Sequence, residues 1–398
     1  MTRLYASAGA VVATGVTDPR LLMLDQTRAN GERQTVAPKG RLEPGEAPLA
    51  AALREVTEEA GLTGLRYAGY LGRESYQFTD HDAVPAAKTV DWFLLTTDNT
   101  TATAAAGEGF TEARWHTPAD AATTASHPGF VAFLDRAATI ARWRGNGPLP
   151  FSTVLDAAVR DIAAAAQPLL DPHPTAGIAV CGSAARGDFV DGWSDIDLIA
   201  YGLPRNDDLT ATLTGLVTGT ATRLGAPISL HVADDTGRRV PPAGPLHDTK
   251  LQTALRRIGV DVAVIAGAAP TTQPPPAEPD PHAALTDLHT FAADRAAQPA
   301  SGIPARRDRA RRILSVTCSA ARLAALTIDE QADLRLPALV DVLDRHHPGA
   351  RITHLLRDYD AFRRGGAPDL DTAEQLAGHA AAAIDDLIRR LHQPAATG

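Results

Sequence analysis

The chain has 398 residues, of which 44% are hydrophobic and 21% are charged, and its formal net charge is −9. This composition excludes a largely disordered chain, and the lack of any run of about 18 apolar residues excludes a membrane-spanning helix. The acidic balance argues against binding nucleic acid mainly by electrostatics. The two cysteines, Cys181 and Cys318, are far apart without metal-like spacing, so we expect a cytoplasmic protein with reduced thiols.

The first segment of the chain combines strand and helix signals. Apolar runs typical of strands occur at 9–14, 21–25 and 89–96, and one strong helix pattern occurs at 48–60. A turn-rich stretch at 144–150 follows. We therefore expect a first domain at 1–143 that mixes strands with helices.

The second segment alternates strands with helices. The predicted elements are a helix at 154–167, strands at 177–181, 196–201 and 228–232, and a helix at 207–223. Such alternation predicts an α/β domain, which we place at 151–269.

The last part of the chain is predicted to be helical. Prolines crowd residues 270–281, which reads as an extended, semi-rigid linker. Strand signals then vanish, and helical periodicity recurs at 282–297, 305–327, 335–346, 351–364 and 372–392. The predicted fold class is therefore multidomain α/β plus all-α, with a C-terminal helical bundle at 282–394.

A dense motif, GRLEPGEAPLAAALREVTEEAGL, occupies residues 40–62. Pro48 suits the first turn of a helix. Leu49, Leu53 and Val56 fall at i, i+4 and i+7, which gives an apolar stripe that can dock on a sheet.

The same helix carries an acidic face. Glu55, Glu58 and Glu59 are neighbours on it, since residues three and four apart lie side by side. Three adjacent carboxylates repel one another unless a divalent cation neutralises them, and Mg²⁺ suits carboxylate and phosphate oxygens. Arg54 can form ion pairs that orient these acids. The alternative is an acidic helix face that only contacts solvent.

The motif resembles the Nudix box at every defined position: Gly40, Glu46, Arg54, Glu55, Val56, Glu58, Glu59, Gly61 and Leu62. The resemblance covers about residues 1–141 and implies a Nudix α/β/α sandwich. It also implies a pyrophosphohydrolase that uses Mg²⁺, or alternatively Mn²⁺, to direct water onto a phosphorus of a nucleoside diphosphate linked to another group. By the same resemblance, Glu58 and Glu59 are the principal metal ligands, Glu55 a further ligand or base, and Glu46 a supporting acid.

Four residues outside the box are candidate substrate contacts. Pro38-Lys39-Gly40 resembles the Nudix subgroup of diadenosine polyphosphate, diphosphoinositol and some oxidised-nucleotide hydrolases, and Lys39 can contact a phosphate. Lys88 lies on a strand predicted to border the site. Tyr76 and Phe78 alternate, so they share one face and either stack on a base or belong to the core.

A second motif, IAVCGSAARGDFVDGWSDIDLIAYG, occupies residues 178–202. A strand leads into Gly182 and Ser183, whose backbone amides and hydroxyl can bind phosphate oxygens. Asp195 and Asp197 are two apart on the next strand, so they point to one face and can hold one or two Mg²⁺ ions against a triphosphate. Arg186 can add positive charge. Two solvated aspartates on an edge strand are the alternative.

This second motif resembles the DNA polymerase beta-like nucleotidyltransferase superfamily over about residues 150–267, and most of all its antibiotic and minimal members. The resemblance implies transfer of a nucleotidyl group from a nucleoside triphosphate to an acceptor hydroxyl. Active relatives usually carry a third carboxylate on a later strand, where this chain has Ser229, His231 and, at the strand end, Asp234. Lys250, on a predicted helix, either reaches a triphosphate or lies at the surface.

Together the motifs predict a bifunctional, metal-binding nucleotide enzyme: a Mg²⁺-dependent Nudix hydrolase fused to a nucleotidyltransferase-like domain. We expect nucleotides or nucleotide derivatives as substrates, a nucleoside triphosphate at the second domain, and neither membrane nor nucleic-acid partners. One alternative makes adenylylation of a small molecule, such as an antibiotic, or of a protein the main activity. In another, the transferase-like domain has lost catalysis and binds a nucleotide to regulate the hydrolase.

Overall fold

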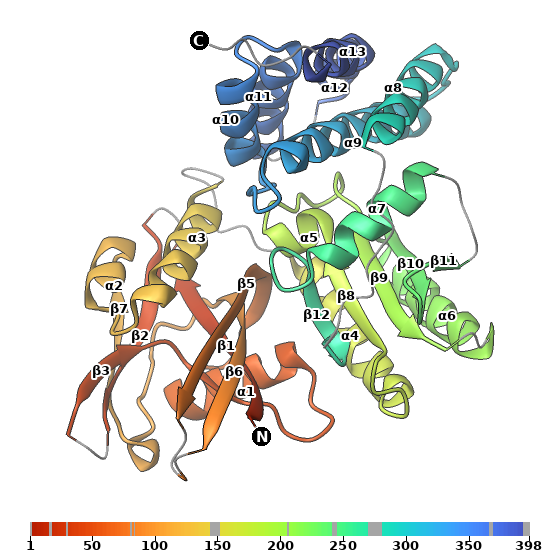
Figure 1. Ribbon diagram of the computed structural model, residues 1–398. Coiled ribbons are helices and arrows are strands. Elements are labelled where there is room, and N and C mark those ends of the chain that lie inside the picture. Colours follow the sequence, from red (N-terminus) through yellow and green to blue (C-terminus); the bar gives the residue numbers. More distant parts are fainter. Residues whose placement is uncertain are drawn as a thin grey trace. The chain divides into compact units, whose positions relative to one another are not determined.

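In the computed structural model the N-terminal strands form one mixed sheet (Figure 1). The structure describes residues 2–15, 18–28, 31–79, 82, 84–143, 152–204, 207–240, 245–269, 281–365 and 369–392. The predicted turn at 144–150 and nearly all of the predicted linker at 270–281 lie outside these residues. The chain folds as two compact units, Met1–Pro241 with Ala254–Pro276, and Pro242–Thr253 with Ala277–Gly398.

The first sheet of the first unit has the strand order β3-β2-β1-β6-β5, with β4 paired to β1 and β7 paired to β2. Its strands are β1 (Arg3–Thr14), β2 (Arg20–Thr27), β3 (Arg33–Val36), β4 (Lys39–Arg41), β5 (Arg66–Thr79), β6 (Pro85–Thr96) and β7 (Phe110–His116). β1 and β6 run parallel, and every other pair in the sheet is antiparallel. The three predicted strands of this segment are confirmed as parts of β1, β2 and β6.

Both faces of this sheet are covered. The helices are α1 (Pro48–Ala60), α2 (Pro118–Thr124) and α3 (Val131–Arg142), with short 3-10 turns η1 (Ala106–Glu108) and η2 (Pro128–Phe130). Alternate residues of β1 belong to different cores: Ala8 and Ala10 pack with Val56 of α1, whereas Val11 packs with Leu134 of α3. The sheet therefore lies between α1 on one face and α2 and α3 on the other.

Strand β5 contains two irregularities. Its register against β6 shifts between Tyr67 and Gly69 and again between Tyr70 and Gly72. Each shift inserts one extra residue, so Tyr67 and Tyr70 are three residues apart yet belong to the same core.

The second sheet has the order β11-β10-β9-β8-β12. It contains β8 (Gly177–Cys181), β9 (Ile196–Leu203), β10 (Ile228–Asp234), β11 (Arg239–Val240) and β12 (Ala263–Gly267), with helices α4 (Thr153–Leu170), α5 (Gly182–Arg186), α6 (Asp207–Leu224) and α7 (Pro245–Arg256). β9 and β10 are parallel, and the other pairs are antiparallel. The predicted strands and helices of this segment are confirmed, whereas β11 and β12 were not predicted.

Strand β5 also contacts the elements of this second sheet. The backbone N–H of Tyr67 donates to Asp156 Oδ1 of α4 at 2.7 Å, and the Tyr67 hydroxyl donates to the carbonyl of Ala184 in α5 at 3.2 Å. The N–H of Arg73 donates to the carbonyl of Gly259 at 2.7 Å. Buried residues of both sheets belong to one hydrophobic cluster, so the first unit has a continuous core.

The second unit is helical in its described part. Besides most of α7, it contains α8 (Pro281–Ala297), α9 (Ile303–Ile328), α10 (Leu336–His346), α11 (Arg351–Arg364), α12 (Leu370–Gly378) and α13 (Ala380–Leu391). The prediction of a single helix at 372–392 was wrong: α12 and α13 are separate, and His379 between them is not helical. None of the described helices is long and apolar enough to cross a membrane.

Candidate functional site

Helix α1 presents its acidic residues beside the short strand β4. Pro48 occupies its first turn, and the N–H of Gly61, at a left-handed φ of 65°, closes its end onto the carbonyl of Thr57. Leu49 and Val56 are buried against the sheet, as the apolar stripe predicts. Only glycine adopts that terminal conformation without strain, so Gly61 fixes where the acidic helix ends.

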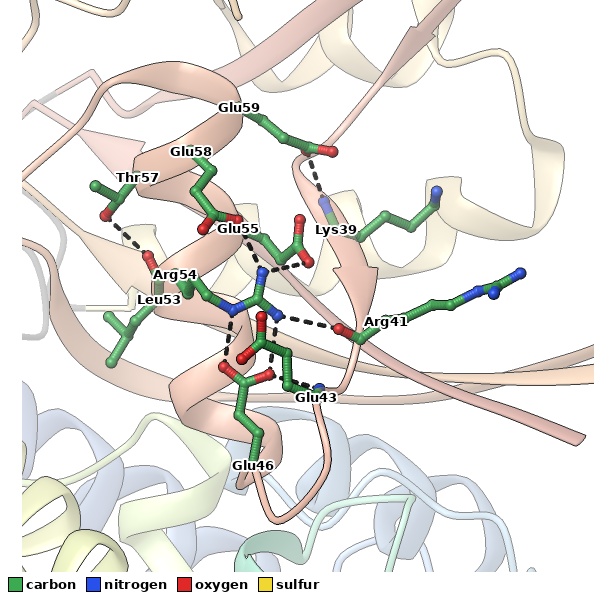
Figure 2. Close-up of polar contacts among 10 residues, drawn as sticks. All are labelled: Lys39, Arg41, Glu43, Glu46, Leu53, Arg54, Glu55, Thr57, Glu58 and Glu59. Carbon is green, nitrogen blue, oxygen red and sulfur yellow. Dashed lines mark hydrogen bonds and ion pairs between the residues drawn. The ribbon is translucent and has the colours of Figure 1, made fainter. Parts of the chain in front are cut away.

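Arg54 is the centre of an ion-pair network that Figure 2 shows. Its Nε and Nη2 donate to the two carboxylate oxygens of Glu46, each at 2.9 Å, and Nη2 also reaches the carbonyl of Arg41 at 3.0 Å. Its Nη1 donates to Glu55 Oε1 and to Glu58 Oε2, each at 2.8 Å. The bond to Glu46, together with those to Glu55 and Glu58, raises the pKa of Arg54, so one fixed cation orients three acids.

The carboxylates of α1 meet β4 at very short range. The backbone N–H of Lys39 donates to Glu59 Oε2 at 3.0 Å. A Cβ placed on Gly40 would lie 1.8 Å from Glu55 Oε1. Across the strand pair, a Cβ on Gly9 would lie 2.5 Å from the Lys39 Cβ and 2.7 Å from the Trp92 ring. Glycine at these two positions therefore lets β1, β4 and α1 approach one another closely.

Burial is the largest cause of the pKa shifts of two acids on α1 and of the two nearby lysines. It raises the pKa of Glu59 to about 8 and also raises that of Glu55, against the opposing effects of the Lys39 N–H and of Arg54. Burial likewise lowers the pKa of Lys39, and that of Lys88 to about 8. Carboxylates that are costly to ionise in this way are stabilised by any additional cation that reaches them.

The three acids of α1 differ in exposure, and two of them are paired with Arg54. Glu58 is 48% exposed, while Glu55 and Glu59 are buried. Within the described ranges, no three His, Cys, Asp or Glu side chains are arranged to hold a metal ion. The donor chemistry fits a hard divalent ion, and Arg54 bonds one carboxylate oxygen of Glu55 and one of Glu58.

A cavity of about 980 Å³ borders the acidic cluster. Its lining residues are Gln26, Thr27, Arg28, Val36, Ala37, Lys39, Glu59, Glu108, Gly109 and Phe110. Glu108, at the end of η1, opposes the ionisation of both Glu55 and Glu59. The sequence did not predict this further acid, because one glutamate outside the motif has no spacing that relates it to the helix.

The other predicted substrate contacts lie close together on strands β5 and β6. Lys88 of β6 pairs with Tyr5 of β1 on one side and with Tyr76 of β5 on the other. Phe78 lies 5.9 Å from the Tyr5 ring and 6.1 Å from the Tyr76 ring, between centroids, and Arg41 lies over Tyr5 at 4.1 Å. Because Tyr76 is 39% exposed and Phe78 is not buried, the pair does not belong to the core.

The second motif forms a smaller cluster in the same unit. Gly182, at a φ of 68°, has its Cβ position 2.9 Å from Asp197 Oδ2, so only glycine allows this approach. Asp197 pairs in register with Ser229, whose hydroxyl donates to Asp197 Oδ1 at 2.8 Å. Asp195 directly precedes β9, and Ser183 lies half-buried in the first turn of α5.

The remaining candidates of this motif have other surroundings. Arg186 is buried, 3.8 Å from the carboxylate of Asp188. Asp234 Oδ1 accepts from the N–H groups of Thr236 and Arg238, each at 2.9 Å, and so stabilises the turn between β10 and β11. Lys250 is exposed on α7, in the segment that belongs to the second unit.

One family model matches the part of the chain that contains the first of these sites. A sequence model described as the NUDIX domain matches residues 6–136. None of the curated proteins compared with the chain matches it.

Solved structures similar to this chain include a C. elegans Ap4A hydrolase (23% identity, 33% of this chain and 94% of that chain, TM-score 0.27). The E. coli dihydroneopterin triphosphate pyrophosphohydrolase shares 20% identity over 34% of this chain and 97% of that chain, with a TM-score of 0.27. The MutT protein from Methanosarcina mazei shares 18% identity over 34% of this chain and 94% of that chain, with a TM-score of 0.28. By the match of its sequence to the family model, the N-terminal part of this chain, residues 6–136, is a Nudix domain.

Proposed function

We propose that the Nudix domain is a pyrophosphohydrolase that acts on a nucleoside diphosphate linked to another group, such as a nucleotide or a dinucleoside polyphosphate. The observation that carries this proposal is the carboxylate cluster around Arg54 beside a cavity lined by Glu59 and Lys39. Nudix hydrolases generally use divalent metals such as Mg²⁺, and Mn²⁺ is the alternative here. Glu55, Glu58 and Glu59 would hold the ion, which supplies an activated water and neutralises charge at the phosphates.

The chain's own residues have separate tasks in this proposal. Arg54 holds Glu46, Glu55 and Glu58 in place before the substrate arrives. Glu108 lines the same cavity as Glu59, and we assign it as an acid that would accept a proton from water. Glu59 and Glu108 are assigned by their place in the cavity lining, and the other acids by their ion pairs with Arg54.

Substrate binding falls to the cations and aromatic rings. Lys39 and Lys88 bind phosphate oxygens as point charges, and partial burial strengthens that attraction. Tyr76 is exposed and Phe78 lies half-buried beside it, so this pair of rings can stack on a base. The substrate class is therefore an anion of several phosphates that carries an aromatic group.

A screen with purified protein tests the proposal. Nucleoside di- and triphosphates, dinucleoside polyphosphates and nucleotide sugars are incubated with Mg²⁺, and the products are identified by mass spectrometry. We expect one class to be cleaved at a phosphoanhydride bond, and Glu58→Gln to abolish the cleavage without changing the melting temperature. The exposed Glu112→Gln is the matched control. Turnover retained by Glu58→Gln would reject the site.

For the domain at 151–269 we infer a nucleotidyltransferase-like nucleotide site that binds without transferring. The observation that favours this reading is the Ser229 hydroxyl on Asp197 where a third carboxylate is expected. Asp234, the other candidate acid, is bonded within its own turn. With Asp195 and Asp197 alone, the site has fewer carboxylates with which to hold the Mg²⁺ ions that would neutralise charge on a nucleotidyl group in transfer.

Calorimetry with ATP and Mg²⁺ tests this second site. Because the Nudix site of the same chain can also bind nucleotide, we expect the wild type and the surface variant Asp208→Asn to bind one more ATP per chain than Asp197→Asn binds. No transfer from α-labelled ATP to antibiotics or protein is expected, whereas Ser229→Asp, which supplies an acid, should introduce it. Transfer by the wild type would instead make adenylylation an activity of this chain.

A further inference from the structure

Two histidines of the helical unit contact each other where α8 begins and α13 ends. His282 lies in the first turn of α8, and His392 directly follows α13. Their ring centroids are 3.8 Å apart with an interplanar angle of 78°, and the Nε2 atoms of the two rings face each other. The contact joins residues 110 positions apart in the sequence.

The tautomer of His392 follows from its other nitrogen. Nδ1 of His392 lies 2.7 Å from the carbonyl oxygen of Ile388, in the last turn of α13. A carbonyl only accepts, so Nδ1 carries the proton and donates it. In the neutral ring, Nε2 of His392 then has no proton, and its lone pair is directed at His282. A ring held through its second nitrogen by a backbone carbonyl is the usual arrangement of metal-binding histidines.

We propose that His282 and His392 together bind a divalent transition-metal ion, such as Zn²⁺, Ni²⁺ or Cu²⁺, through their Nε2 atoms. Imidazole nitrogen suits these ions, whereas Mg²⁺ prefers oxygen, so this site is chemically separate from the acids of α1. In the part of the chain that the structure describes, no group of three His, Cys, Asp or Glu side chains could hold a metal. With two imidazole ligands, water would complete the coordination, and the ion would exchange readily.

Such an ion would clamp the bundle. α8 and α13 pack against each other, with Leu285 and Leu387 both buried. An ion that binds the folded pair but not the separated histidines stabilises the folded helices in proportion to the logarithm of its concentration.

The test uses the whole chain with Mg²⁺ present to occupy the acidic sites. Electron paramagnetic resonance of stoichiometric Cu²⁺ should show coupling to two imidazole nitrogens, and Zn²⁺ should raise the melting temperature of the helical unit. We expect both signals to disappear in His282→Gln and in His392→Gln. His354→Gln, an exposed histidine of α11, is the matched control and should retain them.

Two results would overturn the proposal. One is a two-nitrogen signal and a Zn²⁺ shift that persist unchanged in both variants, because the ion would then bind elsewhere. The other is the absence of any metal effect in the wild type, which would leave the pair as a proton-sharing hydrogen bond. Circular dichroism of the metal-free variants shows that each one folds, so a lost signal reports the site rather than the fold.

Discussion

Arg54 contacts three acids at once, which a lysine side chain at the same position could not do. Its planar guanidinium bonds both oxygens of Glu46 with one edge and still reaches Glu55 and Glu58 with Nη1. A lysine has one charged nitrogen and cannot hold these three acids in fixed directions. The position of the carboxylates therefore depends on the shape of the cation and not only on its charge.

We expect Arg54→Lys to lower kcat of the proposed hydrolysis by about 10- to 100-fold, the range typical of residues that orient metal ligands. The Mg²⁺ concentration needed for half-maximal rate should rise with it. Steady-state kinetics at several Mg²⁺ concentrations measure both effects. Arg66→Lys, which changes the exposed ion pair with Asp98, should leave them unaltered. An unchanged Mg²⁺ dependence in Arg54→Lys would contradict the orienting role.

The site was partly predictable because part of it is local. Helical spacing alone places Glu55, Glu58 and Glu59 on one face and Val56 on another, as the structure has them. The close approach of Gly9 to Lys39 and the position of Glu108 arise from strand pairing between distant segments, which no local pattern encodes. The catalytic and binding roles of all these residues stay predictions.

Asp156 connects two elements that the sequence alone does not relate. It lies in the first turn of α4 and accepts the N–H of the buried Tyr67 on β5. Burial raises the pKa of the Asp156 carboxyl above its ordinary value, although the Tyr67 N–H opposes that change. Asp156 thus satisfies a buried donor while carrying a charge that the site disfavours.

Asp156→Leu should reduce the free energy of unfolding by about 1–3 kcal/mol, because it leaves the Tyr67 N–H without its acceptor. Asp156→Asn keeps an oxygen there and should cost much less at pH 7. Because the folded pKa is raised, the wild type gains stability relative to Asp156→Asn as the pH falls through the range above the ordinary pKa of aspartate. Urea unfolding at pH 7 and pH 5 measures these differences.

The exposed Asp161→Leu, on the same helix, is the matched control and should change little. A wild type and an Asp156→Asn variant with parallel pH profiles would show that the Asp156 carboxyl is not shifted. An Asp156→Leu variant as stable as the wild type would show that the contact between α4 and β5 contributes nothing.

At the scale of the molecule, the sheets of the first unit share one hydrophobic cluster, which includes Tyr67 and Tyr70 of β5 with Ala184 and Ala185 of α5. Gly69 lies so close to this helix that its Cβ would be 3.1 Å from the Gly187 Cα. Sequence periodicity predicted the strands and helices of 1–143 and of 151–269, but not the packing of β5 against α5. An apolar residue does not specify which partner covers it. The two sheets are therefore expected to unfold together.

A fragment of residues 1–143 should consequently be less stable than a fragment of residues 1–269 and should self-associate, because the apolar side of β5 loses its cover. Thermal unfolding and size-exclusion chromatography of the two fragments measure this. A monomeric 1–143 fragment with the same melting temperature as 1–269 would show that the Nudix domain needs nothing from the second sheet.

The two register shifts in β5 affect how this chain is compared with others. Each shift adds one residue to β5 that has no partner in β6, at Ala68 and at Leu71. An alignment that runs straight through 66–73 against a strand without such insertions would exchange the two faces between the shifts, at Gly69 and Tyr70, and would displace every residue downstream by two positions, Tyr76 and Phe78 among them. A single-residue gap at each point restores the correspondence, so any family profile that compares substrate contacts on this strand has to allow for both.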